Sequence, residues 1–583
     1  MFKLFKNFTK KDIAAIITCI ALIVFQVWLD LRLPDYMSEI TKLVQTEGST
    51  IGEILVQGGY MMACAFGSLL SSFVVGYIAS KLSANFSYTL RGKVYNKVLS
   101  FGTEEIKNFQ TSSLITRTTN DVTQLEMIIA MGLQMLIKAP IMAVWAVSKI
   151  LNKSLQWSLL TGFFVVLLLV VISIIMIIVL PRFERVQKLI DNINNVTRES
   201  LTGIRVVRAF NAEDYQENRF GKVNEDLTKM QLFNQKTFAI MMPLMQAVMQ
   251  FLTLGIYFIG AYLIDAAMMS DKITLFSDMV IFSSYGMQVI MSFLMLAMIF
   301  MMWPRAQVSA RRINEVLDSD IHIKDGSFDG KTAEVGCVEF KNVSFKYPDA
   351  NEYLLRNISF KVNKGQTIAF IGSTGSGKSS LINLVPRFYD VTDGEVLVDG
   401  VNVKDYTLKA LHDKIGYVPQ KAVMFTGTVK SNVCYGNKSV SEEEMKKAID
   451  VAQGTEFVSK MDKTYDAHIA RGGTNVSGGQ KQRLAIARAI AKKPEIYIFD
   501  DSFSALDYKT DSVLRSELKK YTGDATNLIV AQRIGTILNA DVIVVLDKGK
   551  CVGMGTHKEL MENCPVYKEI ALSQLSKEEL NNA

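Results

Sequence analysis

The stretch Gly372-Ser373-Thr374-Gly375-Ser376-Gly377-Lys378-Ser379 decides the fold of the C-terminal part of this chain. The apolar run Thr367 to Ile371 precedes it, and Ser380 to Val385 follows with a helical pattern. In this order of strand, loop and helix, the glycines let backbone amides wrap phosphates. Lys378 would reach the β and γ phosphates, and the Ser379 hydroxyl would hold Mg²⁺. The stretch therefore predicts an α/β P-loop nucleotide-binding domain.

Two further segments extend this prediction. The apolar strand Glu495 to Phe499 ends in Asp500, a position suited to the water shell of a magnesium ion. Ser477-Gly478-Gly479-Gln480, called the signature segment below, opens a predicted helix whose N-terminal amides form a second phosphate-binding surface. Because one chain needs only one such cradle per nucleotide, the second one predicts that nucleotide is held between two chains.

The N-terminal part of the chain reads as a membrane domain. A helix needs roughly 20 apolar residues to cross a bilayer, because its backbone polar groups must be satisfied internally. Six runs meet this length: Ile13 to Leu31, Ile54 to Leu82, Met127 to Leu151, Trp157 to Leu180, Phe238 to Ile264 and Phe276 to Trp303. They predict an all-α transmembrane domain of six long helices fused to the nucleotide-binding domain.

Charge predicts the orientation of these helices. The polar connections after the second and fourth runs hold fifteen Lys and Arg residues, far more than the three alternate connections. By the positive-inside bias, these connections, both termini and the nucleotide-binding domain are cytoplasmic in a multi-pass protein of the plasma membrane. Both connections read as long helices whose tips, Ser112 to Asp121 and Phe210 to Gln216, are expected to meet cytoplasmic domains. They fit solvated helical hairpins as well.

Composition supports this division. The chain has 583 residues, a hydrophobic content of 49% and a net charge of +7. Its basic residues lie mostly near membrane ends and not in one patch, which argues against a nucleic-acid partner. The six cysteines show no metal or disulfide spacing. We expect a transmembrane domain over 1–317 with an interfacial N-terminal helix, a linker over 318–335 and an ATP-binding domain over 336–583.

Two features of the membrane domain carry open alternatives. Methionines are frequent in the fifth and sixth runs, at Met241, Met242, Met245, Met249, Met287, Met291, Met295, Met298, Met301 and Met302. Flexible thioethers suit a cavity that repacks around dissimilar apolar ligands, but a stripe at helical spacing also fits ordinary packing. Lys138, beside Pro140, is either a functional charge at membrane depth or an interfacial residue.

The motif order resembles an ABC ATPase, and the fusion order resembles half of a bacterial type IV exporter. The motifs that show this resemblance are the phosphate loop, Gln420 in Tyr417-Val418-Pro419-Gln420, the signature segment, Asp500, and Ser504-Ala505-Leu506-Asp507. Leu33-Pro34-Asp35-Tyr36-Met37-Ser38 and Gly203-Ile204-Arg205-Val206-Val207-Arg208-Ala209-Phe210 resemble stretches of the same family. The resemblance implies that Tyr347 stacks on adenine, that Gln420 senses the γ-phosphate and reaches the metal, and that Asp507 signals across a dimer. It also implies that Ser380 joins the ATP-binding set.

The sequence departs from this family at two catalytic positions. Asp501 stands where the family has the glutamate that orients the attacking water, so its carboxylate is shorter by one methylene. Gln532 stands where the family has a histidine, and an amide can donate a hydrogen bond but cannot carry a proton. Ala470-Arg471-Gly472-Gly473 also lacks an acidic residue common before the signature segment. Slow hydrolysis at this site is expected.

These departures resemble heterodimeric exporters with unequal ATP sites. The chain is expected to pair with a different, homologous half and to move hydrophobic, drug-like compounds out of the cytoplasm, using ATP and Mg²⁺. Its own site would bind ATP and turn it over slowly, while its signature segment completes the site of the partner. A homodimer that tolerates both changes, an exporter of a dedicated peptide or lipid, and an ATP-gated channel or regulatory membrane protein remain alternatives.

Overall fold

The structure is a computed structural model, and it describes residues 2–6, 8–46, 48–151 and 154–574. The chain divides into two compact units. The first, called the helical unit here, comprises residues 1–99 and 111–319. The second, called the sheet unit, comprises residues 100–110 and 320–583.

The helical unit consists of long helices. Its elements are α1 (Phe2–Phe5), α2 (Lys10–Gln45), α3 (Ile51–Leu99), α5 (Thr111–Thr118), α6 (Asn120–Leu151), α7 (Leu155–Thr202), α8 (Ile204–Ala209), α9 (Glu213–Ala266) and α10 (Met269–Asp318). Six helical segments among the described residues are long and apolar enough to cross a membrane. Five contain one of the predicted runs whole, and the fourth, Leu155–Val179, covers the run Trp157 to Leu180 except for its last residue. Six membrane-spanning helices are therefore confirmed by length and composition.

Helix boundaries follow from local chemistry. The Thr9 side chain accepts from the backbone N–H of Asp12, and the Asp12 carboxylate accepts from the backbone N–H of Thr9, which fixes the start of α2. No comparable stop signal lies between the apolar part of α7 and its polar continuation, where Pro181 sits inside an unbroken helix. This continuity explains why α7 extends well beyond the apolar run that the sequence marks.

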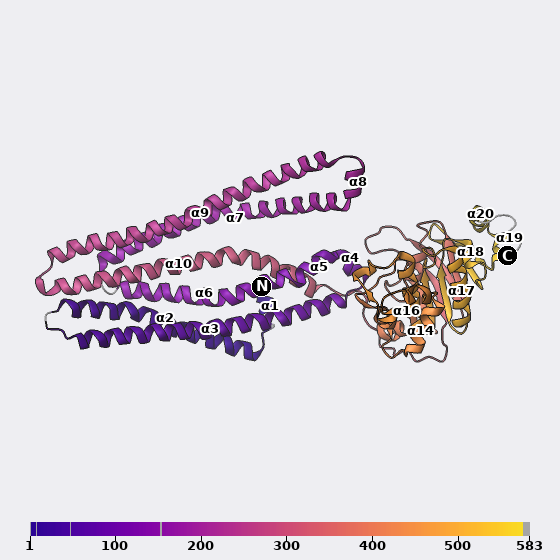
Figure 1. The fold of residues 1–583 in the computed structure, drawn as a ribbon, viewed down its shortest axis with the longest axis horizontal. Coiled ribbons are helices and arrows are strands. Elements are labelled where there is room, and N and C mark those ends of the chain that lie inside the picture. The colour runs from indigo at the N-terminus through magenta and orange to yellow at the C-terminus, as the bar shows by residue number, and fades with distance from the viewer. Residues whose placement is uncertain (1, 7, 47, 152–153, 575–583) are drawn as a thin grey trace. The chain divides into compact units, whose positions relative to one another are not determined.

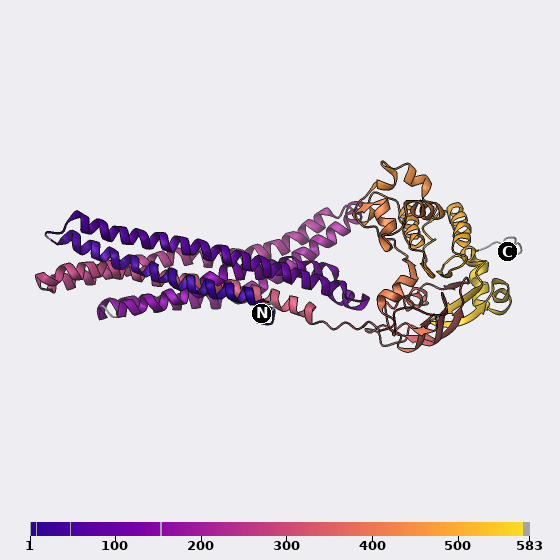
Figure 2. The ribbon, with the colours of Figure 1, turned by 90° about the horizontal axis from the view of Figure 1, so that it is seen from below.

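The helices pack as neighbouring pairs. Figures 1 and 2 show α2 and α3 lying side by side, and α6 packs along α10. The α7 and α9 hairpin diverges from the other long helices toward α8 (Figure 1). The main contacts of α8 are with α7 and α9, the helices that it joins. The cytoplasm-facing end predicted for this hairpin thus lacks extensive packing within the helical unit.

In the described residues, the strands of the sheet unit form three sheets. Its strands are β1 (Val338–Phe345), β2 (Leu355–Val362), β3 (Thr367–Gly372), β4 (Asp393–Val398), β5 (Val401–Asn402), β6 (Ile415–Val418), β7 (Gly427–Thr428), β8 (His468–Ile469), β9 (Ile496–Asp500), β10 (Thr526–Val530), β11 (Val542–Asp547) and β12 (Lys550–Gly555). The central sheet has the order β12-β11-β3-β10-β9-β6, and all neighbours in it are parallel except β11 and β12. The other two sheets of the unit are an antiparallel sheet of order β2-β1-β4-β5 and the two-stranded β7-β8 ladder.

The sheet unit also contains helices, most of which lie between its strands in the sequence. They are α4 (Thr103–Phe109), α11 (Lys378–Ile382), α12 (Leu408–Lys414), α13 (Val429–Val433), α14 (Glu442–Val451), α15 (Thr455–Ser459), α16 (Gly478–Lys492), α17 (Tyr508–Tyr521), α18 (Ile534–Ile537), α19 (His557–Asn563) and α20 (Pro565–Gln574), with short 3-10 turns at Cys434–Gly436, Thr464–Asp466 and Arg471–Gly473. Strands β3 and β9 flank β10 and run parallel to it, so Gly372 and Asp500 reach the same edge of the sheet. This edge carries the predicted site.

A short helix from the first polar connection belongs to the sheet unit. The sequence pointed to Ser112 to Asp121 as the tip of this connection, but those residues form α5 and the start of α6 in the helical unit. The helix that groups with the sheet unit is α4. The buried Glu105 carboxylate accepts from the backbone N–H of His322 at 3.0 Å and lies 2.9 Å from its Nδ1. Burial alone would raise the pKa of Glu105, but these hydrogen bonds from His322 lower it overall.

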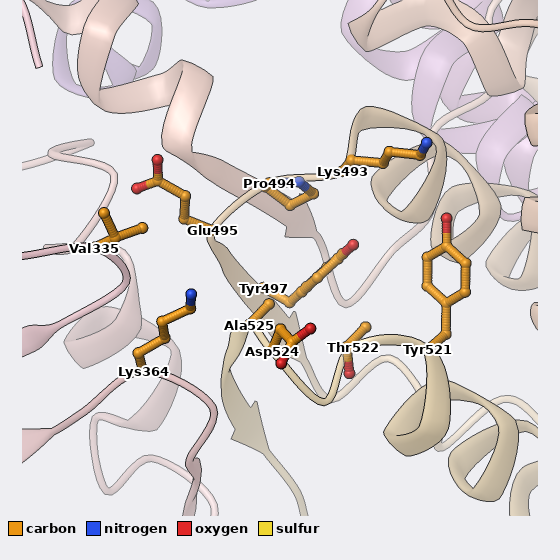
Figure 3. A pocket seen from close by; sticks show the side chains of 10 residues that line it. All are labelled: Val335, Lys364, Lys493, Pro494, Glu495, Tyr497, Tyr521, Thr522, Asp524 and Ala525. Atoms are coloured by element: carbon orange, nitrogen blue, oxygen red, sulfur yellow. The ribbon is translucent and has the colours of Figure 1, made fainter. Parts of the chain in front are cut away.

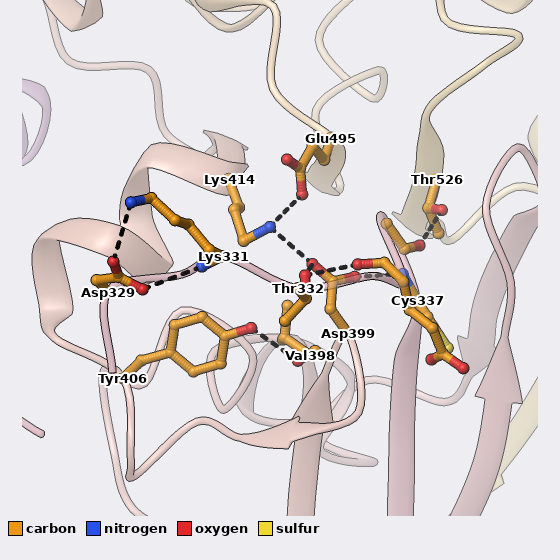
Figure 4. Close-up of polar contacts among 12 residues, drawn as sticks. Asp329, Lys331, Thr332, Cys337, Val398, Asp399, Tyr406, Lys414, Glu495 and Thr526 are labelled. Atoms are coloured by element: carbon orange, nitrogen blue, oxygen red, sulfur yellow. Dashed lines mark hydrogen bonds and ion pairs between the residues drawn. The ribbon is translucent and has the colours of Figure 1, made fainter. Parts of the chain in front are cut away.

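A buried ion network links three separate segments of the sheet unit. The Lys414 ammonium lies 2.8 Å from the Asp399 carboxylate and 2.7 Å from Glu495, and the side chain of Asp399 is fully buried (Figure 4). Asp399 also accepts from the backbone N–H of Cys337 at 2.8 Å. Burial by itself lowers the pKa of Lys414, but the hydrogen bonds to Asp399 and Glu495 raise it overall.

Lys414→Met is therefore expected to destabilise the sheet unit by about 3–5 kcal/mol, because it leaves the buried Asp399 without its counter-ion. The matched control is Lys331→Met, whose pair with Asp329 is largely exposed and should contribute about 0–1 kcal/mol. The shift of the thermal unfolding transition of the full chain measures both effects. Equal shifts for the two variants would contradict a structural role of the buried network.

Candidate nucleotide-binding site

The predicted phosphate loop joins β3 to α11. Gly372 lies so close to the neighbouring strand β11 that an added Cβ would lie 2.0 Å from the backbone oxygen of Leu546. Gly377, the residue before α11, has a left-handed φ of 95°. Both positions require glycine for backbone reasons. Between them, residues 373–376 form the turn, in which the backbone N–H of Ser376 donates to the backbone oxygen of Ser373.

Lys378 sits at the start of α11 with its ammonium turned into the loop. It donates to the backbone oxygens of Gly372 and Ser373, both at 2.9 Å. Burial lowers the pKa of Lys378, while the carboxylates of Asp501 and Asp500 oppose that shift. An ammonium placed at a glycine-rich loop before a helix can bind polyphosphate oxygens.

The residues predicted for magnesium divide into two groups. The Ser379 hydroxyl donates to Asp500 at 2.7 Å, so these two oxygen donors lie together, and burial raises the pKa of Asp500. Gln420 instead donates from Nε2 to Asp501 at 3.2 Å. No set of three His, Cys, Asp or Glu side chains suited to a metal occurs in the part of the chain that the structure describes. The Ser379 and Asp500 pair fits Mg²⁺, because this ion takes few protein ligands and uses phosphate and water oxygens for the rest.

Asp501 is the centre of an amide cluster. Its Oδ2 accepts from Nε2 of Gln532 at 2.8 Å and from Nε2 of Gln420 at 3.2 Å. Burial raises the pKa of Asp501, and the hydrogen bond from Gln420 opposes that shift. Asp501 has a φ of 45°, a left-handed conformation that short polar residues tolerate best. The structure thus brings Asp501, Gln532 and Gln420 together as the sequence predicts, with one carboxylate oxygen shared by two neutral amides.

Two supports of this cluster were not visible in the sequence. Gln574 in α20 donates from Nε2 to the backbone oxygen of Gln532 at 2.8 Å and accepts from the backbone N–H of Ile534 at 2.8 Å. The Ser502 hydroxyl donates to the backbone oxygen of Val418 at 3.0 Å, ahead of Gln420. These contacts join segments far apart in the sequence, so no local pattern could have marked them.

Tyr347 stands at the edge of the site. Its hydroxyl lies 2.7 Å from the Ser380 hydroxyl, and its ring meets that of Tyr389 edge to face at 5.2 Å. The ammonium of Lys107 in α4 lies 5.8 Å from the centre of the Tyr347 ring and 2.8 Å from Asp349. The loop that bears the predicted adenine-stacking ring is therefore in contact with α4.

The signature segment caps α16. The Ser477 hydroxyl accepts from the backbone N–H of Gln480 at 3.3 Å, and Gln480 Oε1 accepts from the backbone N–H of Ser477 at 2.9 Å. A Cβ added at Gly478 would meet no atom within 4 Å, whereas one at Gly479 would lie 3.3 Å from the backbone oxygen of Ala505. Asp507 caps α17 by accepting from the backbone N–H of Thr510 at 2.9 Å. Packing within this chain therefore does not require glycine at position 478.

A separate hollow of about 310 Å³ lies where β9 begins (Figure 3). Among its lining residues are Lys364, Lys493, Tyr497 and Asp524. None of the residues predicted for the nucleotide site lines it. It is therefore distinct from the phosphate loop and its neighbours.

Comparison with known proteins agrees with this geometry. Residues 13–303 match the ABC transporter transmembrane region, and residues 355–504 match the ABC transporter family. An uncharacterized ABC transporter ATP-binding protein of Mycobacterium tuberculosis is 38% identical over 554 residues, 93% of each chain. A Staphylococcus aureus protein, named provisionally as a multidrug export ATP-binding/permease protein, is 33% identical over 85% of this chain and 86% of its own length. The structure of a bacterial Atm1-family ABC exporter with ATP bound has the same fold, with a TM-score of 0.82 at 22% identity over 97% of this chain and 98% of that one.

Proposed function

Because the chain belongs to the ABC transporter family and has the fold of an exporter half, we propose that it is one subunit of a heterodimeric exporter whose two ATP sites are unequal. It would move hydrophobic or amphipathic compounds out of the cytoplasm. The other subunit would be a homologous half that supplies the faster site. ATP binding would close the two nucleotide-binding domains and turn the membrane cavity outward.

The Asp501 cluster carries the proposal of a slow site. A general base must hold the attacking water within hydrogen-bond reach. Oδ2 of Asp501 is already engaged by Gln532 and Gln420, and its side chain is one methylene shorter than glutamate. Gln532 offers a neutral donor near the γ-phosphate where a histidine could carry positive charge. Both features favour holding ATP over cleaving it.

The phosphate loop supports binding by this chain. Lys378 and the loop amides would hold the phosphates of ATP, and Tyr347 would stack on the adenine. Mg²⁺, held by Ser379 and Asp500, would neutralise charge on the phosphate oxygens. Binding therefore does not depend on the altered residues 501 and 532.

Two observations support a dimer. Gly478 faces open space in its own chain, so a glycine there is suited to the close approach of phosphates bound by another chain. The α7 and α9 hairpin stands apart at its α8 end and exposes Phe210 and Tyr215, which favours a second subunit as its partner. The intact signature segment would then serve the site of that subunit.

The proposed class of substrate is supported by the membrane helices and by one relative. Met287 and Met291 of α10 expose thioethers, whereas Met241 and Met245 of α9 are buried in the core, so only part of the methionine stripe is available to a ligand. The side chain of Met301 lies outside the described residues. The provisional multidrug name of the Staphylococcus aureus relative favours drug-like compounds over a dedicated peptide or lipid.

Transport into inverted membrane vesicles tests this function. Vesicles that hold the assembled pair should accumulate an apolar dye against its gradient when ATP is added, and should not do so with ADP. An ATP-gated channel would only equilibrate the dye, because a channel cannot concentrate solute. Equilibration without accumulation, across dyes of both charge signs, would overturn the exporter assignment.

A further inference from the structure

A cavity of about 310 Å³ lies between α6 and α10 of the helical unit, which run side by side in Figure 1. Its walls combine thioethers, two serines and two larger polar side chains, among them Lys138, Met142, Met287, Gln288, Met291 and Met295. Small-molecule sites in proteins are mostly apolar cavities with a few converging polar groups. This cavity has that character and the adaptability of methionine.

Lys138 is the only charged side chain among the described residues that line the cavity. Its ammonium lies 3.0 Å from the Asp30 carboxylate of α2, and both side chains are mostly buried, at 22% and 17% exposure. Asp30 does not line the cavity, and its other carboxylate oxygen accepts from the Ser68 hydroxyl. A ligand in the cavity therefore meets the ammonium first, with the balancing carboxylate behind it.

Gln288 adds a second polar feature. Its Nε2 donates to the backbone oxygen of Asp30 at 3.4 Å, which joins it to the same pair. Its buried Oε1 has no hydrogen-bond partner among the described residues. Because almost none of this oxygen is exposed, its unmet hydrogen bond is a cost of the packing around the pair and not a contact that a ligand could make.

We propose that this cavity binds an anionic amphiphile, with its acidic group at Lys138 and its apolar body among the methionines. The proposal rests on the proposed export function and narrows its substrates. A carboxylate or sulfonate gains a charge-assisted hydrogen bond from Lys138. A cationic amphiphile of equal length instead brings like charge toward the Lys138 ammonium. The cavity therefore prefers acids to the cationic dyes commonly used as export probes.

Equilibrium binding of three dansyl probes that share the same alkyl chain and differ only in their end group tests this preference. They are an eleven-carbon carboxylate, its methyl ester and the matching amine, titrated onto the purified complex in non-ionic detergent without nucleotide. The complex should bind the acid about tenfold tighter than the ester and bind the amine most weakly. Equal affinity for acid and ester would overturn the proposal.

Paired variants locate the effect. Asp30→Asn with Lys138→Met removes both charges without stranding either one, and should weaken acid binding about tenfold while leaving the ester within twofold. The matched control, Asp35→Asn with Lys149→Met, removes a similar pair that does not line the cavity and should leave all three affinities unchanged. An equal loss in both double variants, or none in the first, would contradict the role of Lys138.

A filling variant tests the cavity itself. Met291→Trp should weaken both the acid and the ester, because its larger side chain occupies their common volume. Unchanged binding of both would place the site elsewhere. Because all these titrations omit nucleotide, they do not depend on how the two ATP sites divide their work. If the complex prefers acids but fails to concentrate them in vesicles, the exporter assignment is refuted and the preference of the cavity for acids still stands.

Discussion

Gly478→Asp in this chain is expected to lower ATP turnover by the assembled transporter at least about a hundredfold, whereas Asp501→Asn in the same chain should leave it within about twofold. The first change puts a carboxylate among the helix N-terminal amides that would face the phosphates of ATP bound by the partner. The second changes a carboxylate that, in this account, contributes little to turnover. Steady-state ATPase activity of the purified pair at saturating ATP measures both.

The two variants are matched in folding risk. The space around Gly478 is open, so the aspartate side chain fits without displacing atoms of its own chain. Asp501→Asn keeps the shape of the side chain, although the amide must turn its oxygen toward Gln532. A loss for Asp501→Asn as deep as that for Gly478→Asp would show that turnover depends on the carboxylate of Asp501, and would contradict the asymmetric assignment.

Asp501→Glu combined with Gln532→His is expected to raise ATP turnover at the site of this chain by about tenfold or more. Glutamate extends the carboxylate toward the attacking water, and histidine restores a donor that can carry positive charge. The left-handed backbone at Asp501 sets a limit, because a longer side chain there costs about 1–2 kcal/mol. The gain should therefore fall short of a fully competent site.

The clearest readout uses a complex that already carries Gly478→Asp. With the site of the partner silenced, the remaining turnover reports the site built on Lys378, Asp500 and Asp501. Gln532→His combined with Asp501→Asn is the control, since it restores the imidazole without the carboxylate. If this control gains as much as the full restoration, the carboxylate at 501 is not what limits hydrolysis.

Local chemistry made much of the fold predictable. The phosphate loop could be identified because Gly372 and Gly377 meet backbone requirements that few other residues satisfy. The six apolar runs could be identified because a bilayer demands length and apolarity along each helix. Asp501 and Gln532 were found by their place in the motif order, and the structure joins them at 2.8 Å.

What could not be predicted depends on contacts between distant segments. Nothing near Lys138 in the sequence indicates Asp30 as its partner, because the pair forms only when α2 and α6 pack. Likewise, α4 groups with the sheet unit through contacts such as that between Glu105 and His322. Periodicity within an all-apolar helix also does not tell which methionines line a cavity. Packing decides these features.

Single-turnover analysis of nucleotide bound to the assembled transporter tests the unequal sites most directly. Labelled ATP is trapped in the closed complex, excess nucleotide is removed, and bound ATP and ADP are counted per complex after one round. Unequal sites predict about one ADP and one retained ATP per complex, with the ATP in contact with Tyr347 and Lys378 of this chain. Two ADP per complex, formed at equal rates, would contradict it.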